Sequence, residues 1–185
     1  MSLDRRAFVR SGAMGLLAFQ VAGTIALLRP REARAQSVPL RVLTPDDQRV
    51  VEALGETLLP GATDSGIAHY LDQQLAADPA DSLLMLRYLD VPPPYAAFYK
   101  PAIAAVDVCA RRLHGKRFAD CSNDERVAFV TAMQKADPEG WQGPPAAFFY
   151  FVLRSDVVDV VYGTEEGFEK LGIPYMAHIP PTTKW

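Results

Sequence analysis

Apolar side chains recur three or four positions apart along most of the chain beyond residue 43. Two stripes open this region: Val50, Val51, Leu54 and Leu58, followed by Ile67, Leu71 and Leu75. That spacing places apolar side chains on one face of an α-helix, whereas a strand needs alternation, which no segment sustains. The pattern therefore predicts an all-α fold, a small single-domain bundle of about five to six helices with an irregular C-terminal tail.

Local signals predict where these helices begin and end. Thr44 caps a helix that Pro45 opens, and Ser122 with Glu125 forms the capping box of a later helix. Gly115 is expected to end the helix between them. An extended lead-in is expected at residues 36–42. The expected helices cover residues 45–58, 67–75, 81–88, 95–113, 122–133 and 146–162, with a short turn capped by Thr164 after them.

The expected helix at residues 146–162 is the most apolar of the set. Its first half, residues 148–153, is apolar on every face. A helix of that kind belongs in the interior of a domain, so we expect it at the centre of the bundle with few positions in water.

The first 35 residues have the pattern of an export signal. Arg5 and Arg6, followed by Phe8, precede a weakly apolar stretch of sixteen residues, 13–28. Paired arginines before such a stretch are typical of a twin-arginine (Tat) signal, which the Tat translocase reads. The alternative is an uncleaved membrane anchor, although sixteen helical residues span only about 24 Å of a ~30 Å hydrocarbon core.

A small-x-small cleavage site follows this stretch, formed by Ala33 and Ala35 before Gln36. The predicted organisation is therefore a Tat signal peptide at residues 1–35 and a helical accessory domain at residues 36–185, exported to the periplasm. Tat carries proteins that are already folded, commonly with a cofactor. This chain has no Cys-x-x-Cys-His haem motif and no Gly-x-Gly-x-x-Gly loop, so something other than a cofactor of its own is expected to account for this route.

Charge divides unevenly between these two parts. Six of the 19 basic and two of the 22 acidic residues lie in residues 1–35, which carry a net charge of +4. Residues 36–185 therefore hold 13 basic and 20 acidic side chains, a net charge of −7, against −3 for the whole chain. Such an acidic domain lacks the basic face that nucleic-acid binding needs. A length of 185 residues is also too short for a two-domain dehydrogenase.

The two cysteines, Cys109 and Cys121, flank one expected turn. In the periplasm such a pair can oxidise, and closing this loop would stabilise the fold by about 3 kcal/mol. We predict a disulfide; the alternative is two buried free thiols.

Other candidate chemistry is sparse. His69, His114 and His178 lack a second ligand at the spacing of a known metal motif. The carboxylate pairs at residues 156/159 and 165/166 could do acid–base work, although a solvated or interface face and a helix N-terminal pair are the favoured explanations. A basic run at residues 111–117 is expected to be solvated.

The tail at residues 163–185 is apolar and irregular, so it cannot bury its own large side chains. It must lie on its own domain or on a partner, because exposed apolar patches mark interaction sites. We predict a partner-docking surface made of Tyr162, Phe168, Leu171, Ile173, Pro174, Tyr175, Met176 and His178.

Short motifs follow one another along nearly the whole chain. They are residues 4–8 (Asp-Arg-Arg-Ala-Phe), 43–45 (Leu-Thr-Pro), 57–60 (Thr-Leu-Leu-Pro), 66–72 (Gly-Ile-Ala-His-Tyr-Leu-Asp), Phe118, 162–163 (Tyr-Gly) and 171–174 (Leu-Gly-Ile-Pro). Their order resembles that of the gluconate 2-dehydrogenase subunit 3 family. The tail departs from the commonest family pattern, which has a longer glycine-rich ending.

This resemblance implies a non-catalytic small subunit of a periplasmic dehydrogenase for sugars, polyols or aldonic acids. The large, GMC-type subunit of such complexes carries FAD and lacks its own signal, and a cytochrome c subunit with haem c often takes the electrons. The small subunit supplies the Tat signal and helps the flavoprotein fold, assemble and cross the membrane. The alternatives are a stand-alone periplasmic enzyme, or a binding module, that uses His69, His178 and nearby carboxylates.

Overall fold

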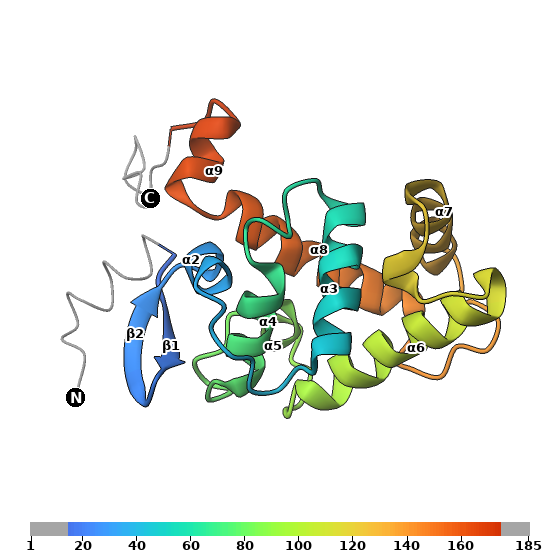
Figure 1. Cartoon of the computed structure of the whole chain (residues 1–185), viewed down its shortest axis with the longest axis horizontal. Coiled ribbons are helices and arrows are strands. Elements are labelled where there is room, and N and C mark those ends of the chain that lie inside the picture. The colour runs from blue at the N-terminus through green and yellow to red at the C-terminus, as the bar shows by residue number, and fades with distance from the viewer. Residues whose placement is uncertain (1–14, 175–185) are drawn as a thin grey trace, which may run out of the picture.

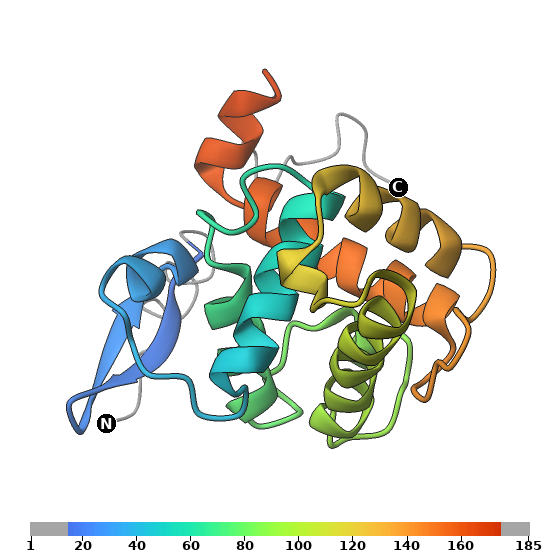
Figure 2. The same cartoon turned by 45° about the vertical axis from the view of Figure 1, so that its right-hand side comes forward.

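Helices account for almost all regular structure in the computed structural model, which describes residues 15–174 (Figures 1 and 2). The elements are β1 (Leu17–Val21), β2 (Thr24–Leu28), α2 (Pro30–Ala35), α3 (Pro45–Leu58), α4 (Ile67–Ala76), α5 (Met85–Tyr88), α6 (Ala96–His114), the 3-10 turn η1 (Phe118–Asp120), α7 (Asn123–Met133), α8 (Ala146–Tyr162) and α9 (Glu165–Lys170). The predicted all-α class is confirmed, with one small hairpin added.

Helix α8 forms the centre of the bundle, as predicted. It contacts α3, α4, α5, α6, α7 and α9, and it crosses behind α3 in Figure 1. Phe149, Val152 and Val157 on α8 are fully buried. The expectation that few side chains of α8 are exposed to solvent is wrong on one face, where Phe151 is 44% and Val158 is 39% exposed.

Local capping fixes the predicted helix ends. Thr44 Oγ1 accepts a hydrogen bond from the backbone N–H of Asp47 at the start of α3, and Ser122 Oγ does the same for Glu125 at the start of α7. Gly115 ends α6 with a φ of 71°, in the left-handed region that glycine adopts without steric cost.

Helix α5 begins later than predicted, at Met85 rather than at residue 81. The backbone N–H of Met85 donates to the Asp156 carboxylate of α8 at 2.8 Å. The start of α5 therefore depends on a residue 71 positions away in the sequence, and no local signal carries that information.

The apolar stretch of the expected signal forms an antiparallel hairpin, in which Leu17 pairs with Leu28 and Val21 with Thr24. Its turn has positive φ at Ala22 (47°) and Gly23 (81°), as in the tight turns that suit twisted hairpins. The prediction that no segment would form a strand was therefore wrong here, because the two five-residue strands are mostly apolar and do not alternate apolar with polar residues.

The lead-in that joins α2 to α3 is not extended throughout as predicted, because residues 36–37 form a turn, with a φ of 51° at Ser37, and residues 41–43 bend. The Asp72 carboxylate of α4 accepts the backbone N–H groups of Arg41, Val42 and Leu43 at distances of 2.8 to 3.1 Å. Asp72 is 4% exposed, so these three N–H donors supply hydrogen bonds that its buried carboxylate cannot obtain from water. This Asp72 anchor holds the chain against α4 just before the bundle begins.

Candidate partner-docking surface

The corner between α8 and α9 fixes the predicted docking region. Thr164 Oγ1 accepts a hydrogen bond from the backbone N–H of Gly167 at 3.1 Å, which confirms the turn expected after Thr164. A Cβ at residue 167 would lie 2.4 Å from the Cα of Tyr162. Glycine therefore allows α9 to fold back closely on the end of α8.

The residues after α9 are exposed to solvent. Leu171 is 49% and Ile173 51% exposed, and Pro174 is exposed too. Tyr162 and Phe168 are half-buried. Of the predicted docking residues, Tyr175, Met176 and His178 lie outside the described range. In the described part of the tail, the domain itself therefore covers only about half of the surface of the Leu171 and Ile173 side chains.

A second apolar surface lies on α8 and was missed by the sequence analysis. Phe151, Val158 and Tyr162 are separated by seven and four residues, so they share one helix face. Phe151 and Val158 are the exposed members and Tyr162 is half-buried. The spacing was visible in the sequence, but the surrounding apolar residues concealed which face would remain in water.

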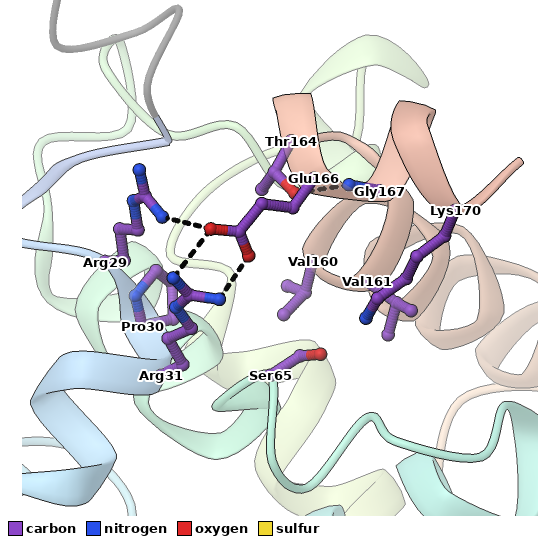
Figure 3. Close-up of a pocket in the computed structure, with 10 residues that line it drawn as sticks. All are labelled: Arg29, Pro30, Arg31, Ser65, Val160, Val161, Thr164, Glu166, Gly167 and Lys170. Atoms are coloured by element: carbon purple, nitrogen blue, oxygen red, sulfur yellow. Dashed lines mark hydrogen bonds and ion pairs between the residues drawn. The ribbon is translucent and has the colours of Figure 1, made fainter. Parts of the chain in front are cut away.

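Glu166 links α9 to the N-terminal segment (Figure 3). Its Oε1 accepts hydrogen bonds from Arg29 and Arg31 at 2.8 Å each, and its Oε2 accepts a further one from Arg31. The Arg31 and Arg29 guanidinium groups hold the pKa of Glu166 below its ordinary value. Beside these ion pairs lies a cavity of about 50 Å³, which Val160, Val161 and Lys170 help to line.

The predicted cleavage residues are part of a folded element. Ala33 has no exposed surface, and Ala35 is the last residue of α2. Residues Arg5, Arg6 and Phe8 of the expected Tat signal lie outside the described range.

The histidines take part in separate contacts. His69 Nε2 donates to the carbonyl oxygen of Val38 at 3.1 Å, and burial lowers the pKa of His69. His114 Nδ1 lies 3.7 Å from Glu125 Oε1. Within residues 15–174, no three His, Cys, Asp or Glu side chains are grouped so that they could hold a metal ion.

The carboxylate pair at residues 156 and 159 does not reach His69. Asp156 is fully buried and accepts hydrogen bonds from the Tyr99 hydroxyl and from the Met85 N–H. Burial raises the pKa of Asp156 to about 7 and also raises that of Asp159. Asp156 thereby ties α8 to α5 and α6, which is a structural role.

The predicted disulfide is absent, since Cys109 and Cys121 are both free and buried. Cys109 Sγ donates to the carbonyl oxygen of Glu139 at 3.5 Å, and Cys121 Sγ donates to that of Arg117 at 3.4 Å. Each thiol thus has its own acceptor. Burial raises the pKa of both thiols, which disfavours the thiolate needed for oxidation.

The basic run at residues 111–117 is neutralised within the domain. Each of its cations pairs with a carboxylate: Arg111 with Asp107, Arg112 with Glu139, Lys116 with Glu125 and Arg117 with Asp46. The run therefore presents no unpaired cluster of positive charge.

Comparison with known protein families identifies the domain. The model of a family described as gluconate 2-dehydrogenase subunit 3 matches residues 45–180, most of the chain. The chain belongs to this family. No curated protein and no solved structure matches it significantly. The resemblance found in the sequence is confirmed, and the family description makes the chain a subunit of a dehydrogenase complex.

The family match begins at Pro45, the first residue of α3, and includes α9. The hairpin and α2 precede the matched range, although they pack on it. Among the described residues, no helix has the length and apolarity to span a lipid bilayer.

Proposed function

We propose that this subunit has no catalytic centre of its own and serves a periplasmic flavin-dependent dehydrogenase for sugars, polyols or aldonic acids. Residues 1–35 supply the Tat signal for a large GMC-type subunit that holds FAD, and residues 36–185 help that subunit fold, cross the membrane and assemble. A cytochrome c subunit with haem c accepts the electrons. Membership of the subunit 3 family is the observation that carries this proposal.

The docking surface for the large subunit is the end of α9 and the residues that follow it. Leu171 and Ile173 are half exposed just after α9, which contacts of Thr164 and Glu166 hold in place. Removing such apolar surface from water stabilises a complex by about 25 cal/mol per Å². A stable interface needs more buried area than these two side chains offer. The exposed side chains of α8, Phe151 and Val158, would supply part of that area.

Exchange of the paired arginines tests the export role. In cells that also express the large subunit, the double variant Arg5→Lys/Arg6→Lys should leave dehydrogenase activity in the cytoplasm, because the translocase no longer reads the signal. The measurement is dehydrogenase activity in periplasmic and cytoplasmic fractions.

The matched control is Arg111→Lys/Arg112→Lys, the same exchange at another adjacent pair, on α6. This variant should export the dehydrogenase normally. Undiminished periplasmic activity with the Arg5/Arg6 variant would show that the large subunit does not depend on this signal.

A further inference from the structure

The hairpin and α2 are docked on the family domain, at one end of the molecule in both views (Figures 1 and 2). We call residues 15–36 the N-terminal latch. Two of its side chains, Arg29 and Arg31, pair with Glu166 as described above (Figure 3). The two arginines lie at the start of α2 and Glu166 in the first turn of α9, so the latch joins the two ends of the described chain.

A close backbone contact supports these ion pairs. Gly66 has a φ of 84°, and a Cβ at this position would lie 2.3 Å from the carbonyl carbon and oxygen of Pro30. The first turn of α2 therefore rests directly on the backbone that begins α4. Only glycine combines that backbone conformation with so close an approach.

Contacts on both sides of the Ala35–Gln36 bond hold the latch in place. Arg34 Nη1 lies 3.4 Å from Asp64, and its Nε lies 3.8 Å from Glu52 of α3. Beyond the bond, Val38 is 5% exposed and its carbonyl oxygen accepts the hydrogen bond from His69. The bond lies between two anchored segments.

The backbone around the Ala35–Gln36 bond does not have the conformation that a protease binds. The N–H of Gln36 donates to the carbonyl oxygen of Glu32 at 2.9 Å, and that of Val38 donates to Ala33 at 2.9 Å. Ala33, the small residue that a signal peptidase must bind, is completely buried. A protease binds its substrate as an exposed, extended chain, so α2 must first undock and unwind.

We propose that the N-terminal latch protects its own processing site, so that cleavage after Ala35 proceeds only when α2 leaves Glu166 and Gly66. The inference rests on the proposed function, which makes residues 1–35 a cleavable signal. When opening and closing are faster than cleavage, the cleavage rate follows the population of the open form. Contacts far from the bond in sequence therefore set the rate at which the signal is removed.

Charge reversal at Glu166 tests this inference. The purified full chain is incubated with signal peptidase in detergent, and mass spectrometry follows the appearance of the product that begins at Gln36. Because two partly exposed ion pairs are replaced by repulsion, Glu166→Lys should be cleaved about tenfold faster than the wild type. Residue 166 is remote from the scissile bond in sequence, so the exchange leaves the sequence recognised by the peptidase intact.

Two controls are matched to this variant. Glu139→Lys makes the same charge change at another exposed glutamate that pairs with an arginine, Arg112 of α6, and should be cleaved at the wild-type rate. A synthetic peptide of residues 26–42 carries the same bond without the domain and should be cleaved faster than either full-length protein. Hydrogen exchange at residues 31–36 gives a readout without protease, and Glu166→Lys should lose the protection seen in the wild type.

The outcomes distinguish a failure of the latch proposal from a failure of the signal assignment. A wild-type chain cleaved as fast as the peptide, or a Glu166→Lys chain cleaved no faster than the wild type, would overturn the latch and leave the export role standing. A peptide that resists the peptidase would instead show that Ala35 is not a processing site, and the inference would fail with that assignment.

Discussion

At the scale of single residues, Asp156 connects three helices. Its carboxylate lies on α8, binds the first N–H of α5 and accepts the hydroxyl of Tyr99 on α6. Burial raises its pKa to about 7, although the two hydrogen bonds act in the opposite direction, and the Asp159 charge adds to the rise. A buried carboxylate of this kind makes stability depend on pH.

Exchange of Asp156 for asparagine should remove that dependence. The folded chain holds a proton on Asp156 up to a pH of about 7, whereas the unfolded chain releases it near the ordinary value of 3.8. The wild type should therefore lose stability relative to Asp156→Asn between these values as pH rises, by up to about 1.4 kcal/mol per pH unit. Urea unfolding of both proteins from pH 4 to pH 8 measures the difference.

The control for this exchange is Asp81→Asn, which changes an exposed carboxyl group in the loop before α5. Its stability should run parallel to that of the wild type over the same pH range. A constant difference between the wild type and Asp156→Asn would mean that Asp156 is ionised throughout, contrary to the effect of its burial.

At the scale of elements, the capping box of α7 is a local source of stability. Ser122 Oγ accepts the N–H of Glu125, and the Glu125 carboxylate accepts that of Ser122 at 2.6 Å. Removing the hydroxyl in Ser122→Ala should lower the free energy of unfolding by about 1 kcal/mol, because an N-terminal N–H loses its acceptor. Thermal and urea unfolding measure this loss.

Ser155→Ala is the matched control, since the hydroxyl of Ser155 binds only the Phe151 carbonyl within α8. Alanine favours the helix at such a position, so stability should stay constant or rise slightly. Equal losses in the two variants would show that the hydroxyl of Ser122 contributes no more than an ordinary helical serine.

Elements whose ends depend on adjacent residues were predictable from the sequence. Thr44 and Ser122 begin helices where expected, and α8 has the predicted bounds of residues 146–162. The start of α5 was not predictable, because Asp156 defines it from a distant helix. The cysteines were wrongly paired because spacing along the chain does not reveal that each thiol faces a different carbonyl group.

At the scale of the whole molecule, the exposed residues after α9 are the proposed binding site of the large subunit. The double variant Leu171→Asp/Ile173→Asp should fold normally, because both side chains are already half exposed. It should reduce co-purification of the large flavoprotein subunit at least about tenfold, since charged groups in an apolar contact lose their hydration. Affinity purification followed by flavin absorbance measures the amount bound.

Val108→Asp/Leu113→Asp is a control of equal exposure, at 54% and 52%, on α6. This variant should retain the flavoprotein. If it loses the partner while the variant after α9 retains it, the docking surface lies on α6 and the proposed assignment is wrong.

The apolar tail was predicted to be an interaction surface because its large side chains have no helical stripe to join, and partner binding there remains a prediction. The contact of Glu166 with Arg29 and Arg31 was not predictable, because it joins positions more than 130 residues apart. In the sequence, these arginines were recognisable only as basic residues near the expected cleavage site. The way the domain holds its own N-terminal segment therefore emerges only from the folded structure.

The Asp72 anchor gives the molecule a mechanical property. If residues 1–35 act as the proposed export signal, a translocase that draws the chain by them applies tension to the lead-in before it reaches α3. Three N–H groups bound to one buried carboxylate pass that tension to α4, in the interior of the bundle, so α3 is not peeled away from its N-terminus. The domain can then be pulled as a folded body, with the force applied at the Asp72 anchor.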